Sequence, residues 1–241
     1  MRLALISDIH GNLPALEAIW EDIRKNGIDK IYNLGDSLYG PLWPEETARF
    51  LIGQSVESLL GNGDEDLITK EVKNTNLEYT YRELSPKSIE WLHALRPSIT
   101  WDEWTLFHAS PGNLTDYLLE KIENGTVRIK SVKEIRGCIQ HISTRFIACG
   151  HSHVARIVSC EEQVMINAGS VGLPAYRDDD PPHAMETFSP MATYVAVDDT
   201  TITIRKIPYD YEKSAKRALK NDRPDWHDWL MTGRVNQIDS E

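Results

Sequence analysis

The chain has 241 residues, of which 41% are hydrophobic, enough to build one large α/β domain (residues 1–241) with a sizeable core. It carries 26 basic and 37 acidic side chains, a formal net charge of −11, and its Lys and Arg residues form no clustered block. An acidic surface repels nucleic acid, so strong binding to DNA or RNA is not expected.

Apolar runs alternate with helical patterns over the first sixty residues. The patterns predict strands at 3–7, 30–34 and 56–60 and helices at 13–26 and 44–52. Asn12 and Pro14 fit the start of the first helix, and Gly27 fits its end. This alternation predicts a parallel sheet with right-handed crossovers.

A polar stretch at residues 66–96 interrupts the alternation, with a helix predicted at 86–95. We interpret it as a small helical insertion. It could form a cap that selects substrates, because predicted functional residues flank it, or it could be a peripheral excursion.

The second half of the chain predicts a second sheet packed on the first. Its expected strands are 104–108, 146–149, 154–160 and 164–167, followed by a hairpin of 192–197 and 201–207, and a helix is expected at 127–141. The tail, 209–241, looks helical and breaks at Pro224. Its apolar Trp226, Trp229 and Leu230 either dock on the body or form a contact in a homodimer.

Five of the apolar runs end in polar residues on tight turns. In an open α/β sheet, ligands bind outside the carboxyl ends of the strands, so these side chains should converge. The converging donors are Asp8, His10, Asp36, Asn62, His108, His151 and His153.

Carboxylate, amide and imidazole donors without a thiolate suit hard or intermediate divalent metals. Seven donors are too many for one tetrahedral ion, so we expect two ions that share one carboxylate. Mn²⁺ is the first expectation, and Fe, Zn²⁺ or Ni²⁺ are the alternatives. Such a pair makes hydroxide available near neutral pH and clamps the oxygens of a displacement at phosphorus.

These blocks resemble the calcineurin-like metallophosphoesterases: Asp8-x-His10, Gly35-Asp36, Gly61-Asn62, a lone His108 and Gly150-His151-x-His153. Residues 8–12 and 167–172 look like the small bacterial and archaeal branch, which includes phosphodiesterases and relatives of the diadenosine tetraphosphatases. The resemblance implies a four-layer α/β/β/α sandwich in which a bridging hydroxide attacks phosphorus without a covalent enzyme intermediate.

The same resemblance implies a role for each donor. The first ion would be held by Asp8, His10 and His153. The second would be held by Asn62, His108 and His151, and Asp36 would bridge the two.

Gly63 departs from the family pattern, in which a histidine often follows the Gly-Asn pair and steadies the phosphate or protonates the leaving group. A missing general acid costs about 10²–10⁴ in rate, and less for a good leaving group. Gly63 therefore shifts the expected substrate toward nucleotide polyphosphates or activated diesters. Asp64 and His183 are the nearest alternative proton donors.

Two further residues have both a structural and a functional interpretation. Asn12 could cap the first helix or donate its amide to a substrate phosphate. Arg177, in a polar loop rich in Asp and Pro, could be a solvated surface residue or could bind phosphate. The predicted catalytic set is thus Asp36, Asn62 and Asn12, and the predicted substrate-binding set is Asn12, Arg177 and Gly63.

The sequence therefore predicts a metal-dependent phosphodiesterase or phosphatase for a small phosphorylated substrate, such as a nucleotide or dinucleoside polyphosphate. A nuclease, a phosphoprotein phosphatase and a non-catalytic metal-binding interaction scaffold are the alternatives. Three sparse cysteines favour reduced thiols in the cytoplasm. Without a basic-then-apolar leader or a long apolar span, secretion and membrane contact are not expected.

Overall fold

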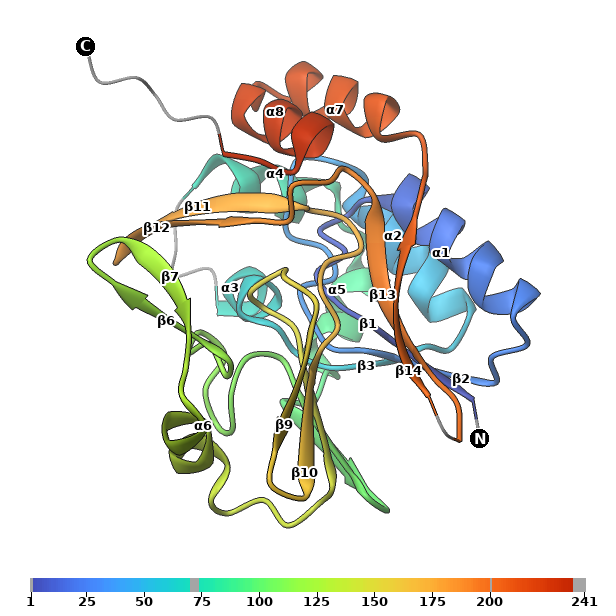
Figure 1. The fold of residues 1–241 in the computed structure, drawn as a ribbon. Helices are drawn as coiled ribbons and strands as arrows, with labels where there is room; N and C mark the ends of the chain where they lie inside the picture. The colour runs from blue at the N-terminus through green and yellow to red at the C-terminus, as the bar shows by residue number, and fades with distance from the viewer. Residues whose placement is uncertain (1, 70–73, 200, 236–241) are drawn as a thin grey trace.

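Two five-stranded sheets pack face to face in the computed structural model, which describes residues 2–69, 74–199 and 201–235 (Figure 1). The first sheet has the order β14-β13-β1-β2-β3. Its strands are β1 (Leu3–Ile6), β2 (Lys30–Asn33), β3 (Glu57–Ser58), β13 (Ala192–Val197) and β14 (Ile202–Ile207). The predicted parallel pairing holds for β1, β2 and β3, but β1 also pairs antiparallel with β13, so this sheet is mixed.

The second sheet has the order β4-β5-β8-β10-β9. Its strands are β4 (Ser98–Trp101), β5 (Trp104–Phe107), β8 (Phe146–Cys149), β9 (Arg156–Cys160) and β10 (Gln163–Asn167). The three central strands are parallel, and the edge strands β4 and β9 are antiparallel to their neighbours. The carboxyl ends of β5, β8 and β10 therefore lie at one edge of the sheet.

Helices cover the outer face of each sheet. Helices α1 (Leu13–Lys25) and α2 (Pro44–Gly53) lie on the first sheet, and α6 (Val132–Ile139) lies on the second (Figure 1). One apolar cluster fills the space between the sheets, and two others lie beneath the helices. The expected four-layer α/β/β/α sandwich is confirmed.

Strand β1 shows how the sequence produces these layers. Successive side chains of a strand point to opposite faces. Leu3 and Leu5 accordingly enter the cluster between the sheets, whereas Ala4 and Ile6 pack beneath the helices. Because both faces are covered, the strand is apolar throughout and does not alternate with polar residues.

Three short helices form the polar stretch between β3 and β4: α3 (Asn62–Thr69), α4 (Thr75–Glu83) and α5 (Pro86–His93). Leu67, Leu77 and Leu92 pack with Leu38 and Ala48 in a cluster of their own, which joins these helices to α2. Residues 70–73 lie outside the described part of the chain. The role of this stretch as a substrate-selecting cap stays a prediction.

Two hairpins replace segments that were predicted otherwise. The helix expected at 127–141 begins only at Val132, after a capping box made by Ser131 and Glu134. Strands β6 (Glu120–Glu123) and β7 (Thr126–Ile129) form a hairpin before it. Strands β11 (Ala175–Asp179) and β12 (Pro182–Glu186) form a second hairpin where a loop was expected.

The helical tail docks on the body. Helices α7 (Tyr211–Lys220) and α8 (Pro224–Thr232) form a hairpin, and Pro224 begins α8. Trp226 and Leu230 pack against Leu42 and Leu173. A homodimer contact by the tail stays a prediction. Within the described residues, every helix is too short or too polar to cross a bilayer.

We predict that Ile166→Ala in the core between the sheets lowers the free energy of unfolding by about 2–5 kcal/mol, because it leaves a cavity at a fully buried site. The matched control is Ile129→Ala, which removes the same atoms from a strand residue that is 53% exposed and should change stability by less than about 0.5 kcal/mol. Urea titration monitored by tryptophan fluorescence measures both. Equal losses would contradict this assignment of the core.

Candidate metal centre

The seven predicted donors lie on turns at the carboxyl ends of strands from both sheets. Asp8 and His10 follow β1, Asp36 follows β2, and Asn62 opens α3 after β3. In the second sheet His108 follows β5, and His151 and His153 follow β8. The two sheets thus bring their donors to one edge of the sandwich.

The backbone at most of these donors is unusual. A positive φ is uncommon for residues other than glycine, and it persists where the surrounding structure enforces it. Five of the donors have φ between +51° and +65°: Asp8, His10, Asp36, His151 and His153. The left-handed turns let side chains that follow straight strands bend back toward a common point.

One group of donors centres on Asp8, whose side chain is fully buried. Its Oδ1 lies 3.2 Å from His153 Nε2 and 4.0 Å from His10 Nε2. The two imidazole Nε2 atoms lie only 3.1 Å apart. Oxygen and nitrogen atoms of these three residues lie within 4.8 Å of one another, close enough to hold a single ion.

A second group centres on His108, which is also fully buried. His108 Nε2 lies 3.0 Å from Asn62 Oδ1 and 3.7 Å from Asp36 Oδ1. The other Asp36 oxygen, Oδ2, lies 3.8 Å from His10 Nε2, so this carboxylate faces both groups. The His151 ring centroid lies 5.2 Å from that of His108. Asp8, Asp36 and His108 also satisfy the spacing for one ion, which gives Asp8 a place in both groups.

Backbone carbonyls fix the tautomer of all four histidines. The Nδ1–H groups of His10, His108 and His153 donate to the carbonyls of Tyr39, Leu34 and Leu173 at 2.8, 2.9 and 2.6 Å. His151 uses its Nε2–H, which donates to the Thr115 carbonyl at 2.8 Å. A carbonyl can only accept, so in each neutral ring the other nitrogen carries a lone pair, as metal-binding histidines require.

A cation fits the space between these atoms. With the tautomers set by the carbonyls, His10 and His153 aim lone pairs at each other across 3.1 Å, which is repulsive unless a positive charge lies between them. Asp8 Oδ1 is buried and accepts no hydrogen bond. Buried acceptors normally find a partner, and a metal ion would supply one. The donor set therefore fits divalent metal.

The surroundings favour the metal-binding protonation states of Asp8, His10 and His151. Burial alone would raise the pKa of Asp8, but the neighbouring His153, His108 and His10 hold it well below its usual range. Burial lowers the pKa of His151 to about 4, and burial together with His153 lowers that of His10. For His108 burial acts downward, but the Asp36 and Asp8 carboxylates outweigh it and raise the pKa. A bound cation would take the place of that proton.

Asn12 has a structural role. Its Oδ1 accepts the Ala15 N–H at 3.4 Å, which caps α1, and also the Ser214 hydroxyl. Its Nδ2 donates to the Gly172 carbonyl and the Tyr209 hydroxyl. The side chain is fully buried, and all of these partners belong to the chain, so the expectation of a catalytic or substrate-binding amide is corrected.

Tyr39 occupies the space that a side chain at position 63 would need. A Cβ added to Gly63 would lie 2.9 Å from Tyr39 Cβ. The Gly63 N–H instead donates to Asp36 Oδ1 at 2.8 Å and so helps to orient that carboxylate. The neighbouring Asp64 carboxylate accepts N–H groups of Ser37 and Gly61. Because the Asp64 carboxylate is fully buried and faces this backbone, it is not placed to give a proton to substrate.

Arg177 and His183 lie on the hairpin of β11 and β12, where a loop was expected. Arg177 is exposed and lines the cavity described below. His183 is buried, and its Nε2 accepts the hydroxyl of Tyr117 at 2.7 Å. Tyr117 in turn stacks on His151, with ring centroids 4.8 Å apart. His183 therefore supports the wall of the site from behind and is not a proton donor to substrate.

A cavity of about 340 Å³ opens onto the donors. Its lining includes the predicted His10, Asp36, Asn62, Gly63, His151, His153 and Arg177. It also includes residues that the sequence did not connect with the site: Tyr39, Asp66, Asn76, Leu173, Tyr176, Asp178, Arg223, Trp226 and Trp229. Tyr39 lies three residues after Asp36, so its proximity could have been expected. Trp226 and Trp229 come from α8, and Arg223 directly precedes it. Nothing in the local sequence connects these residues to the donors.

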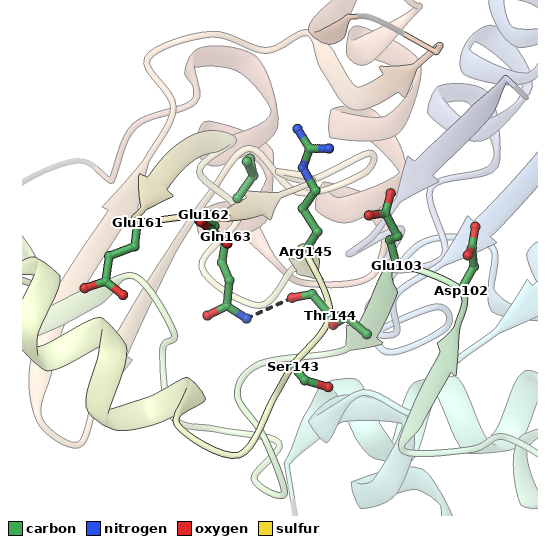
Figure 2. Close-up of a pocket in the computed structure, with 9 residues that line it drawn as sticks. Asp102, Glu103, Ser143, Thr144, Arg145, Glu161, Glu162 and Gln163 are labelled. Atoms are coloured by element: carbon green, nitrogen blue, oxygen red, sulfur yellow. Dashed lines mark hydrogen bonds between the residues drawn. The ribbon is translucent and has the colours of Figure 1, made fainter.

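A larger hollow, of about 720 Å³, lies at the opposite edge of the second sheet (Figure 2). It is formed around the turns that precede β5, β8 and β10, at the amino ends of these strands. Four carboxylates surround it, those of Asp102, Glu103, Glu161 and Glu162. Gln163 Nε2 donates to the Thr144 carbonyl at 2.8 Å (Figure 2). This acidic surface is poorly suited to phosphate.

A family model for the calcineurin-like phosphoesterase superfamily domain matches residues 1–188. An uncharacterized protein of Methanocaldococcus jannaschii is 26% identical over 247 residues, which cover 93% of this chain and 94% of the relative.

Two solved structures resemble nearly the whole chain. A metallophosphoesterase from Sphaerobacter thermophilus superposes with a TM-score of 0.78 at 22% identity, covering 97% of this chain and 99% of its own. A hypothetical protein from Pyrococcus horikoshii gives a TM-score of 0.77 at 19% identity, covering 98% and 99%. At these identities the two structures establish the fold.

We predict that Gly63→Ala lowers the free energy of unfolding by about 1–3 kcal/mol, because the new methyl group overlaps with Tyr39. Gly137→Ala is the matched control. It lies in α6 with no heavy atom within 4 Å of the new Cβ, and it should stabilise the protein by about 0.5–1 kcal/mol. Thermal and urea unfolding of both variants test this. A Gly63→Ala variant as stable as the wild type would show that Tyr39 does not restrict this position.

Proposed function

The chain belongs to the calcineurin-like phosphoesterase superfamily, and we propose that it hydrolyses phosphodiester or phosphoanhydride bonds of small nucleotide-type substrates with two divalent metal ions. It is a metal-dependent hydrolase of phosphate esters. The observation that carries the proposal is the convergence of buried acceptor atoms with no hydrogen-bond donor between them, above all His10 Nε2 and His153 Nε2 at 3.1 Å beside the unpaired Asp8 Oδ1.

We propose that the seven donors hold two ions. Asp8, His10 and His153 would hold the first ion, and Asn62, His108 and His151 the second. Asp36 would bridge them, which is supported by its two oxygens, 3.8 Å from His10 and 3.7 Å from His108. A ligand atom of Asp8 also lies within 4.8 Å of those of Asp36 and His108, so Asp8 is close to both proposed ions. We propose Mn²⁺ first, with Fe, Zn²⁺ or Ni²⁺ as alternatives, because no thiolate is present.

When bound, the two ions would supply positive charge to the phosphoryl oxygens and lower the pKa of water so that a nucleophile forms near neutral pH. The chain's own residues would hold that arrangement. The four carbonyl contacts keep the imidazole lone pairs directed inward, and the Gly63 N–H keeps Asp36 in place.

The choice of substrate follows from Gly63 and the cavity. The histidines among the described cavity residues, His10, His151 and His153, are all proposed ligands, so no other imidazole there would protonate a leaving group. Leaving groups that depart as weakly basic anions need no such proton. The volume, about 340 Å³, suits a small molecule and not a protein surface or a duplex. Nucleotide anhydrides and aryl diesters meet both conditions.

We also propose a cytoplasmic location. Cys138, Cys149 and Cys160 are all unpaired thiols, and reduced cysteines are typical of that compartment.

Asp36→Asn should abolish metal uptake and activity together, because it removes one of the negative charges between the two groups of donors. We expect the loss of at least one of two bound ions and a fall in activity of at least about 100-fold. Elemental analysis and hydrolysis of an aryl phosphodiester measure the two effects. The control is Asp102→Asn, an exposed residue at a similarly positive φ, +48° against +53° for Asp36. Wild-type turnover by Asp36→Asn would reject the assignment.

Among possible substrates, the metal-loaded protein should hydrolyse phosphoanhydrides and aryl esters about 10²–10⁴ times faster than alkyl monoesters, since no general acid replaces the histidine. A panel of mononucleotides, cyclic nucleotides, dinucleoside polyphosphates, aryl diesters and glycerol phosphate tests this ranking. Equal rates on glycerol phosphate would require a proton donor and would contradict the argument from Gly63.

A further inference from the structure

One wall of the cavity comes from the C-terminal helical hairpin, which follows the segment matched by the family model. Arg223, Trp226 and Trp229 line the same space as His10 and His153. The ring of Trp226 meets the ring of His10 edge to face, with centroids 5.9 Å apart. A residue far from the donors in sequence therefore touches one of them directly.

The hairpin is firmly attached to the body. Asn221 Nδ2 donates to the Pro41 carbonyl at 2.6 Å, and Arg217 Nε donates to the Leu42 carbonyl at 3.1 Å. Ser214 donates to Asn12 Oδ1 at 2.8 Å. Trp226 is only 2% exposed. These contacts fix the wall relative to the donors, so its side chains can act as a preformed part of the site.

Arg223 is the best oriented charged group on this wall. Its Nε and Nη2 donate to the two Asp225 oxygens at 2.8 and 2.5 Å, and its guanidinium lies 5.7 Å from the ring centroid of Trp226. Guanidinium has five N–H donors in a planar fork, and Asp225 uses only one edge of it. The other edge, formed by one N–H of Nη1 and the second N–H of Nη2, keeps two roughly parallel donors in a geometry that matches a phosphate.

Asp225 orients the guanidinium and offsets part of its charge. The Asp225 side chain is 39% exposed, whereas that of Arg223 is 20% exposed, so solvent screens the carboxylate more than the guanidinium. Arg177, on β11, is a second cation in the lining. The lining also contains the carboxylates of Asp66 and Asp178, so the two guanidinium groups are local positive charges on walls of mixed charge.

We infer that Arg223 binds an anionic group of the substrate other than the phosphoryl group that reacts, so that the protein prefers substrates with two or more phosphates. This inference rests on the proposed function. Metal ions at the donors would take up one phosphoryl group, and the Arg223 guanidinium in the same cavity would bind a second. Nucleoside polyphosphates and dinucleoside polyphosphates have this chemistry, whereas a simple diester has only one phosphorus.

The test compares diadenosine tetraphosphate with bis(p-nitrophenyl) phosphate in metal-loaded full-length protein. Arg223→Met should lower the ratio of the two kcat/KM values by about 10–100-fold, the loss expected for a hydrogen-bonded charge. Arg223→Lys keeps the charge without the fork and should lower the ratio by a smaller factor. It also serves as the second variant if Arg223→Met does not fold. Elemental analysis should find the wild-type metal content in both variants.

Arg205→Met is the matched control. Arg205 donates through Nε and Nη2 to both Asp22 oxygens, at 2.8 and 3.0 Å, but it lies on β14 and does not line the cavity. In the Arg205→Met variant, the ratio of kcat/KM for diadenosine tetraphosphate to that for bis(p-nitrophenyl) phosphate should stay within about twofold of the wild-type value. A similar fall in this control would show that the effect is not specific to the cavity and would overturn the inference.

The remaining outcomes separate the inference from the proposed function. If the wild type hydrolyses both substrates and Arg223→Met leaves the ratio unchanged, or lowers both rates equally, Arg223 does not select a second phosphate and the inference alone is overturned. If the metal-loaded wild type hydrolyses neither substrate, the proposed function fails and the inference fails with it.

Discussion

Repulsion among buried acceptors is the constraint on which this structure depends. Two imidazole nitrogens and a carboxylate oxygen meet at one edge of the sandwich with no donor among them. Such an arrangement of largely buried acceptors is unfavourable without a cation. Four backbone carbonyls prevent the rings from turning away, and left-handed turns prevent the chain from relaxing. The fold therefore holds mutually repelling acceptor atoms together at one edge of the sandwich, and a divalent metal ion would relieve that repulsion.

The same edge explains how an acidic protein can be suited to phosphate. The net charge of −11 is spread over the chain, and the larger hollow at the amino ends of the second sheet carries four carboxylates. The cavity at the carboxyl ends has Arg177 and Arg223 as well as the carboxylates of Asp66 and Asp178, and it adjoins donors that fit divalent metal. Local charge, and not the overall balance, decides what each end of the sandwich can bind.

Strand ends were predictable from the sequence, because buried runs that stop at Asp, Gly or His are distinctive. The predicted start of the helix at residue 127 was wrong, because Val127 matched the helical spacing of apolar residues by chance. A stronger signal was present in Asn124-Gly125, a two-residue hairpin turn with both φ values positive, +52° and +73°. The position of Arg223 could not be predicted, because it depends on the docking of α8 across a long sequence separation, and periodicity carries no such information.

The pairing of β1 with β13 has a consequence for biosynthesis. Residues 3–5 lie at the centre of the first sheet, yet their antiparallel partners are residues 195–197. During synthesis on the ribosome, β1 can pair with β2 early, but it lacks its other neighbour, β13, until most of the polypeptide has been made. A fragment ending at residue 188, where the family match stops, would lack β13, β14 and the wall that carries Trp226. The end of the family match is thus not a boundary of autonomous folding, and completion of the sheet edge that carries the donors is a late event in the synthesis of each molecule.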